Sequence, residues 1–279
     1  MSHDVFLQEI CQHPDDINAR LVYADWLEDV GDPRGEFIRI QCELATLSDE
    51  DDEQLDRKAE LAYRQRDLLE EFGAQWDADI RPFADHWQHR CGFVEYVELT
   101  FQAFVKHGEA LFGKHPITAA TLRGAASAHI AALAASPWLG RLTRLCLDGC
   151  ALEDDDLQTL CKSTQLAQLT RLTLSHNRLG DAGVRALAAC PALAQLEILD
   201  LSENQIRNAG VQALAESPHL ANLQALVLSS NQIRLTGARA LAASETLTGL
   251  EYLDLSQNLL DMRAVEALRE RFGRDVCRA

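Results

Sequence analysis

"LTRLCLDGCAL" (142–152) opens a motif that recurs as "LTRLTLSHNRL" (169–179), "LEILDLSENQI" (196–206), "LQALVLSSNQI" (223–233) and "LEYLDLSQNLL" (250–260). The first leucines of these five segments are 27 residues apart, without an insertion between any two. Self-similarity at a fixed period of about 20–50 residues is the signature of a stacked-repeat architecture. The sequence therefore predicts a solenoid that gains one unit every 27 residues from residue 142 onward.

The segments between the motifs repeat as well. "AGVRALAACPAL" (182–193) and "AGVQALAESPHL" (209–220) place small and apolar residues at helical spacing and then carry a proline, which ends a helix. Each unit is thus expected to be a short strand, a turn and an α-helix. One such unit cannot bury its own leucine face, whereas stacked units share a continuous core.

An asparagine completes the motif in four of the five units, at Asn177, Asn204, Asn231 and Asn258. The resulting pattern, LxxLxLxxNxL, resembles the ribonuclease-inhibitor-like class of leucine-rich repeats over residues 142–272. That resemblance implies a curved α/β horseshoe, with parallel strands inside, helices outside and protein recognition by the concave face. Cys150 replaces the asparagine in the first unit, so we expect that turn to be less well tied.

Weaker copies of the strand pattern precede residue 142. Ile117, Ala120 and Leu122 fit a degenerate strand, and the segment 94–99 fits an earlier one followed by a helix over 102–112. The predicted repeat domain therefore spans residues 92–279 and contains about seven strands.

Residues 1–91 have helical spacing instead. One predicted helix includes Ile17 and Leu27 and ends at Gly31, and the next begins at Asp32 and Pro33. A long helix is expected over 53–72, and a last short helical segment between Trp76 and Trp87. We therefore predict an all-α N-terminal domain over residues 1–91.

The block "RLVYADWLEDVGDPRGEFIRIQ" (20–41) is more specific than a generic helical hairpin. It resembles the bacterial repeat-companion domain, a module that precedes leucine-rich repeats, and the match covers residues 4–42. The resemblance implies a bacterial, cytoplasmic protein, and capping of the first repeat is the physical role we expect. Asp25, Trp26, Arg34 and Glu36 could form a recognition patch, but packing of the tryptophan and pairing of the charges is the favoured interpretation.

The composition of the chain restricts which classes of partner are expected. A formal net charge of −17 argues against nucleic acid or an anionic membrane as partner, and it permits a basic protein. The sequence shows neither an apolar run of about 18 residues nor a secretion signal. The eight cysteines form no paired CxxC spacing, so reduced thiols in the cytoplasm are expected.

Several groups could in principle carry chemistry. His86, His89 and Cys91 offer zinc-type ligands without an evident fourth, and Cys161 with His176 could form a nucleophile and base. The acidic blocks at 49–53 and 153–156 lack the spacing of a calcium loop. No phosphate-binding or hydrolase motif is present. We therefore predict no enzymatic activity, no cofactor and no metal.

The predicted function is a protein interaction module or scaffold. The strand leucines should point into the core, which leaves their neighbours on the concave face. From these neighbours we select the predicted binding residues Arg144, Arg171, Thr173, Ile198, Asp200, Val227, Tyr252 and Asp254. Regulation of small GTPases is the alternative, because an activator family shares this repeat class. A ubiquitin-ligase adaptor ranks lower, because residues 4–47 lack the Leu-Pro opening of an F-box.

Overall fold

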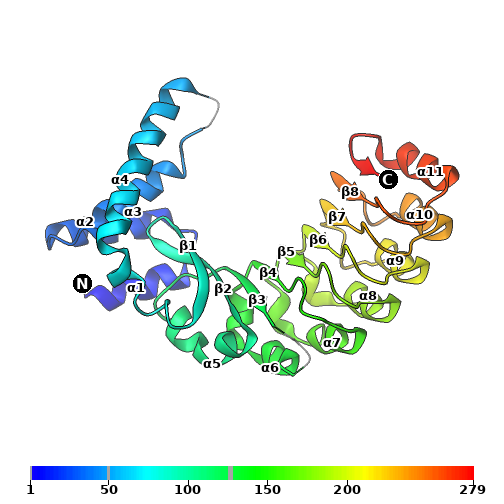
Figure 1. The fold of residues 1–279 in the computed structure, drawn as a ribbon, viewed down its shortest axis with the longest axis horizontal. Coiled ribbons are helices and arrows are strands. Elements are labelled where there is room, and N and C mark those ends of the chain that lie inside the picture. Colours follow the sequence, from blue (N-terminus) through cyan, green and yellow to red (C-terminus); the bar gives the residue numbers. More distant parts are fainter. Residues whose placement is uncertain (1, 49–50, 125–127) are drawn as a thin grey trace. The chain divides into compact units, whose positions relative to one another are not determined.

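The computed structural model describes residues 2–48, 51–124 and 128–279, and the chain forms two compact units. Unit 1 consists of Met1–Leu99 together with Lys106–Thr118, and unit 2 consists of Thr100–Val105 together with Ala119–Ala279. Figure 1 follows the chain through both. No helix in the described ranges is long and apolar enough to span a bilayer.

Unit 1 begins with four helices, α1 (His3–Gln12), α2 (Ile17–Asp29), α3 (Arg34–Leu44) and α4 (Asp52–Trp76). Asp16 starts α2 by accepting the backbone N–H of Asn18 at 2.9 Å. Gly31, with φ +75°, turns the chain out of that helix. The carboxylate of Asp32 accepts the N–H of Arg34 at 2.9 Å, the capping bond expected of that residue. Helix α3 itself begins at Arg34, one residue later than predicted.

The expectation that residues 1–91 contain only helices is wrong at β1 (Ala84–Arg90), which pairs antiparallel with β2 (Phe93–Thr100). Cys91 and Gly92 form the two-residue turn with φ of +48° and +86°, the combination that matches the twist of paired strands. A side chain at residue 92 would collide with Ile38. The polar segment "ADHWQHR" has no apolar alternation, so backbone pairing to β2 makes it a strand. The strand predicted over 94–99 is the other arm of this hairpin.

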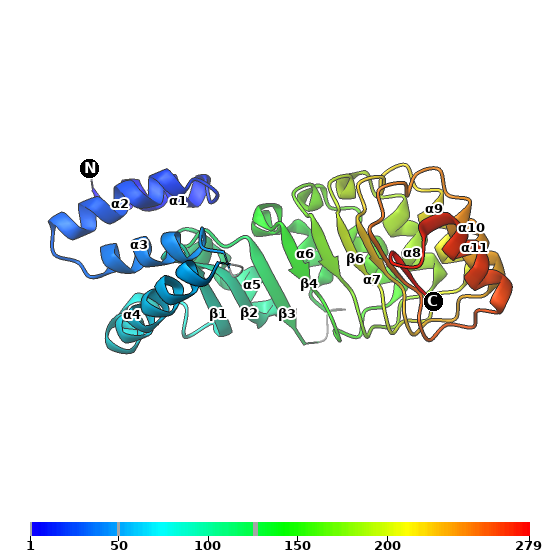
Figure 2. The same ribbon diagram turned by 90° about the horizontal axis from the view of Figure 1, so that it is seen from above.

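Helix α5 (Phe101–Phe112) contributes residues to both units, and it matches the helix predicted over 102–112. The described residues of unit 2 then form seven short strands, each parallel to its neighbour. They are β3 (Ala119–Arg123), β4 (Arg144–Cys146), β5 (Arg171–Thr173), β6 (Ile198–Asp200), β7 (Ala225–Val227), β8 (Tyr252–Asp254) and β9 (Cys277–Arg278). Figure 2 shows these strands in a row, in which β3, β4 and β6 are labelled. The predicted solenoid of parallel strands and helices is confirmed, including the degenerate strand before residue 142.

Helices line one side of this row of strands in unit 2 (Figure 1). They are α6 (Ile130–Ala135), α7 (Asp154–Leu160), α8 (Asp181–Ala188), α9 (Asn208–Ala215), α10 (Leu235–Ala242) and α11 (Met262–Phe272). Short 3-10 turns follow three of them, at Pro137–Arg141, Thr164–Leu166 and Pro191–Leu193. The central strand leucines Leu145, Leu172, Leu199, Leu226 and Leu253 are at most 1% exposed, so the core lies between strands and helices.

The motif asparagines form a ladder that joins successive repeats. Asn204 accepts the backbone N–H of Leu179 in the preceding repeat at 3.0 Å, and its amide donates to the carbonyls of Leu174, Leu201 and Ser202. The other motif asparagines repeat this arrangement. Cys150 makes only two long sulfur contacts, at 3.2 and 3.5 Å, so the first turn has fewer bonds, as expected.

A second ladder explains the glycines that recur at the helix starts. Asp181 accepts the N–H groups of Arg207 and Gly210 in the next repeat, both at 2.8 Å. A Cβ atom on Gly210 would lie 2.7 Å from the Asp181 carboxylate. The side-chain oxygen of Asn208 likewise accepts the N–H of Gly237, and a Cβ atom on Gly237 would crowd that oxygen. Glycine is therefore required where the carboxylate or amide of one repeat satisfies the orphan N–H groups of the next helix.

Candidate functional site

The side of the strands that faces away from the helices carries two aligned rows of side chains, which we call the strand face. The first row is Arg144, Arg171, Ile198, Ala225 and Tyr252, and the second is Cys146, Thr173, Asp200, Val227 and Asp254. Strand register brings all eight predicted binding residues into these two rows. Adjacent strands are about 4.8 Å apart, so neighbours within a row can touch one partner together.

Two arginines stand next to each other at the start of the first row. Arg144 and Arg171 are directly paired in register, and both are exposed. Neither guanidinium has a hydrogen bond or an ion pair with any residue that the structure describes. Because like charges directly opposite one another on neighbouring strands repel, this pair is an unbalanced positive spot on an acidic chain.

The centre of the strand face is apolar. Ile198, Ala225 and Val227 are half-buried side chains from two neighbouring strands. Tyr252 follows on β8 with 40% of its surface exposed, one of the few large apolar side chains of the chain to be so exposed. An apolar centre beside charged or amphipathic side chains is the usual composition of a protein interface.

The two carboxylates of the second row, Asp200 and Asp254, stabilise the turns that follow their strands, a role that was not predicted from the sequence. Asp200 accepts the N–H and the hydroxyl of Ser202, at 2.8 and 2.6 Å. Asp254 is 7% exposed and accepts the N–H of Ser256 at 2.8 Å. These are aspartate turns, and the recurring "DLS" after each of the two strands is their sequence signal. Asp254 therefore offers little surface to a partner.

Thr173 is half-buried between these features, and its hydroxyl oxygen has no hydrogen-bond partner among the residues that the structure describes. A buried hydroxyl without a partner destabilises the fold by about 1–3 kcal/mol.

The groups considered for metal or nucleophilic chemistry have other partners. One ring nitrogen of His89 lies 2.9 Å from the carboxylate of Asp77, which also accepts the indole N–H of Trp87. His176 pairs with Glu203 at 3.0 Å. Across the described residues, no three histidine, cysteine or acidic side chains gather as a metal site would require. Asp49 and Glu50 of the first acidic block lie outside the described residues.

Two pairs of thiols are in contact. The hydrogen bond between Cys161 and Cys190 lowers the pKa of Cys190, and the one between Cys42 and Cys91 lowers the pKa of Cys91. Three of these four thiols are buried, those of Cys42, Cys91 and Cys190. They therefore contribute to core packing and are poorly accessible as nucleophiles.

The candidate recognition patch in the N-terminal region consists of Asp25, Trp26, Arg34 and Glu36. Most of these side chains pack or pair within the chain, which agrees with the favoured interpretation. Glu36 forms two bonds to Arg64, at 2.6 and 2.7 Å, and Asp25 pairs with Arg39. Trp26 packs against an aromatic cluster that includes Tyr23, with ring centroids 6.0 Å apart. Arg34 is the exception, because no carboxylate in the described ranges lies within ion-pair distance of its guanidinium, and its side chain donates to the carbonyl of Gly92.

Comparison with known proteins supports the repeat assignment. Residues 167–188, 195–215 and 219–242 match the family model described as "Leucine Rich repeat". These segments are leucine-rich repeats. Proteins built from such repeats generally bind other proteins on the extended surface that the stacked units create.

Solved structures with some likeness include an internalin from Listeria monocytogenes, with 22% identity and a TM-score of 0.39 over 55% of this chain and 46% of that one. The BIR2 ectodomain of Arabidopsis thaliana has 23% identity and a TM-score of 0.26 over 42% of this chain and 68% of that one. A plant ice-binding protein has 18% identity and a TM-score of 0.31, over 63% and 61% of the two chains. The chain spans less than half of the internalin. A search of curated proteins returns no match.

Proposed function

We propose that the protein is a non-enzymatic interaction module that binds another protein through the strand face of β4 to β8. The observation that supports this most directly is the unpaired pair Arg144 and Arg171 beside the apolar centre around Val227. A folded chain gains nothing internal from two adjacent guanidinium groups that lack counter-charges. An acidic partner surface would supply them.

The partner that fits this surface has acidic side chains opposite the arginines and an apolar patch opposite Ile198 and Val227. Tyr252 is the expected anchor, since tyrosine and arginine are enriched among residues whose truncation costs at least about 2 kcal/mol of binding. Asp200 and Asp254 serve mainly to hold the turns that position these side chains.

Finer features of the family belong to the same proposal. We infer the ribonuclease-inhibitor-like type from the 27-residue period and the α-helix in each unit. Helices are wider than strands, so stacking such units should curve the row and make the strand face concave. We assign residues 4–42 to the repeat-companion domain on the strength of the motif at 20–41. Eight free cysteines favour a reducing compartment, the bacterial cytoplasm.

The test begins with mild crosslinking in native lysate to identify the partner, followed by titration of the purified pair. The triple variant Arg171→Glu, Val227→Asp and Tyr252→Ala changes the strand face. The matched control Arg239→Glu, Gln212→Asp and Thr236→Ala makes the same change in charge on the exposed helical side, where a groove of about 560 Å³ is the competing surface.

We expect the strand-face variant to weaken the affinity at least 100-fold, which corresponds to about 2.7 kcal/mol. The helical-side control should keep the wild-type dissociation constant within about threefold, in keeping with the ordinary tolerance of surface substitutions. Wild-type affinity in the strand-face variant would refute the proposal. Selective loss in the control would move the binding surface to the helices.

A further inference from the structure

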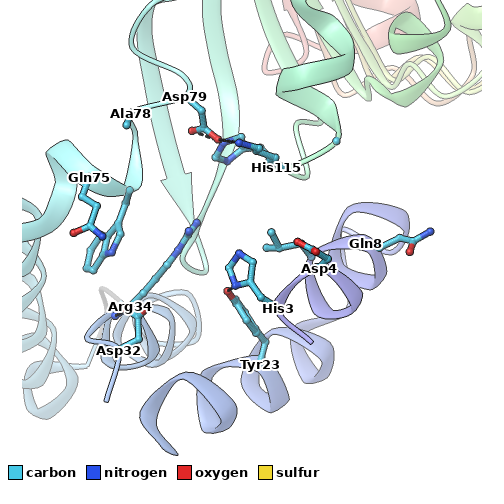
Figure 3. A pocket seen from close by; sticks show the side chains of 14 residues that line it. His3, Asp4, Gln8, Tyr23, Asp32, Arg34, Gln75, Ala78, Asp79 and His115 are labelled. Atoms are coloured by element: carbon cyan, nitrogen blue, oxygen red, sulfur yellow. Dashed lines mark hydrogen bonds and ion pairs between the residues drawn. The ribbon is translucent and has the colours of Figure 1, made fainter. Parts of the chain in front are cut away.

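Unit 1 contains a cavity of about 600 Å³ (Figure 3). Its walls come from α1, α2, the start of α3, the segment from Gln75 to Asp79, and residues 113–115. All of these segments belong to the same compact unit. The volume lies within the range of about 300–1,000 Å³ that is typical of small-molecule sites.

Arg34 extends into this cavity between the pair His3 and Tyr23 on one side and Gln75 on the other (Figure 3). Its guanidinium lies over the ring of Phe93, 5.1 Å from the centroid. The Nε–H is buried, and none of the residues that the structure describes accepts a hydrogen bond from it. A guanidinium has five N–H donors, yet among these residues Arg34 uses a single side-chain donor, Nη2, which reaches the carbonyl of Gly92 at 3.5 Å.

Most other arginines of unit 1 have carboxylate partners, and Arg81, which has none among the described residues, is exposed to solvent. Arg20 is paired with Glu95 at 2.6 Å, and the four arginines Arg39, Arg57, Arg64 and Arg90 each contact a glutamate. Arg34 makes no ion pair within the described part of the chain. Burial lowers the pKa of Arg34 from its usual value, which means that its charged form is poorly solvated. Because arginine stays charged in proteins, the side chain needs an anion.

The wall contains the carboxylates Asp4, Asp32 and Asp79. Asp32 and Asp79 partly offset the effect of burial on the pKa of Arg34, but none of the three lies within ion-pair distance of its guanidinium. Asp32 uses its side chain to accept the backbone N–H of Arg34. Asp79 is bound by Lys114 and by His115, each at 3.2 Å. His115 is 2% exposed, and its second ring nitrogen, Nδ1, has no partner. Two residues that line the cavity, Arg34 and His115, therefore each have a buried polar atom without a partner among the described residues.

We propose that this cavity is a binding site for a small-molecule anion, with Arg34 bonding a carboxylate or phosphate group and His115 making a second polar contact. A planar guanidinium matches two oxygens of either group, and a bidentate pair is both strong and directional. Phe93 holds the plane of the guanidinium, so little side-chain entropy is lost on binding. The site is separate from the strand face, and its ligand does not depend on the protein partner proposed above.

The test titrates the full-length protein with sodium phosphate and, separately, with sodium acetate, using calorimetry against sodium chloride at equal ionic strength. Arg34→Gln removes the proposed anion contact. Arg81→Gln is the matched control, because Arg81 also lies over an aromatic ring, Trp87 at 5.6 Å, and does not line the cavity. Ala78→Trp, at an exposed wall position, fills the cavity without altering the guanidinium.

The wild type should bind at least one of the two anions saturably, with a dissociation constant below about 10 mM. Arg34→Gln and Ala78→Trp should each weaken binding at least tenfold, and Arg81→Gln should leave it within twofold. If Arg34→Gln does not fold, as judged by circular dichroism, Ala78→Trp decides the outcome. Binding of phosphate alone would assign a phosphorylated ligand, and binding of acetate alone a carboxylated one. No binding beyond chloride in the wild type, or wild-type affinity in Ala78→Trp, would overturn the proposal.

Discussion

Replacing Asn204 with alanine tests the ladder that joins the repeats. The side chain is 8% exposed and bonds four backbone groups. Alanine removes all of these bonds and leaves the leucine core unchanged. The effect on stability therefore reports the ladder alone.

The magnitude follows from which groups lose their last partner. The carbonyl of Leu174 keeps the amide of Asn177 at 2.9 Å, and that of Leu201 keeps Asn231 at 2.9 Å. Only the buried N–H of Leu179 is left unpaired, which costs about 1–3 kcal/mol. Because the carbonyls stay bonded, loss of the two amide hydrogens adds only about 1 kcal/mol. We expect a total loss of about 2–4 kcal/mol in the free energy of unfolding.

Urea unfolding followed by far-ultraviolet circular dichroism measures this change, and hydrogen exchange at the amide of Leu179 locates it. Asn204→Asp keeps the shape and the acceptor but places a carboxylate against three carbonyls, so it should destabilise at least as much. Asn222→Ala is the control, because that exposed amide makes one bond, to the carbonyl of Ala194 at 2.7 Å. A loss below about 0.5 kcal/mol for Asn204→Ala, the level of an ordinary surface substitution, would refute the reasoning.

Three further perturbations address other parts of the molecule. Gly210→Ala should destabilise by about 1–3 kcal/mol in urea unfolding, since its Cβ would lie 2.7 Å from the carboxylate of Asp181. Glu95→Gln should cost about 3–5 kcal/mol, because it leaves the 1% exposed guanidinium of Arg20 without its buried counter-ion. The hydrogen bond from His115 holds the pKa of Asp79 well below its usual range. Ionised Asp79 therefore stabilises the fold above about pH 4, and this contribution is lost as the pH falls further. Asp79→Asn should flatten the acid side of the stability curve, measured by thermal unfolding.

The glycine and glutamate substitutions each have an internal comparison. Gly249→Ala should be tolerated, because the nearest atom to its Cβ is 3.7 Å away. Glu43→Gln breaks an exposed pair with Arg57, and surface pairs contribute about 0–1 kcal/mol. If Gly249→Ala lowered the free energy of unfolding as much as Gly210→Ala, the argument from crowding would be contradicted. The same holds for the argument from burial if Glu43→Gln cost as much as Glu95→Gln. An acid limb that stays as steep in Asp79→Asn as in the wild type would contradict the assignment to that carboxylate.

The repeat architecture could be predicted because its determinants are local and periodic. A leucine every 27 residues fixes which side chains must be buried, and Asn204 and its equivalents mark where the chain leaves each strand. The same alternation identified the strand face, since a buried Leu199 forces Ile198 and Asp200 to the other side. Sequence alone could not show that Asp200 and Asp254 are occupied by the turns, although the "DLS" triplet is a usable signal.

Other features depend on contacts between distant residues. Strand β1 forms because its backbone pairs with that of β2. The polar segment 84–90 has no periodicity of its own from which a strand could be predicted. The sequence presents Arg34 as one of several charges on a helical hairpin. The fold places its guanidinium over Phe93, 59 positions along the chain, and no carboxylate of the described residues lies within ion-pair distance of it. The period, the elements of each repeat and the face that the strands expose follow from the amino-acid sequence, because a regular apolar pattern dictates which side chains are buried. Which charges are paired and which face a cavity depends on the folded chain, because ion pairing is set by distances in space that spacing along the chain does not encode.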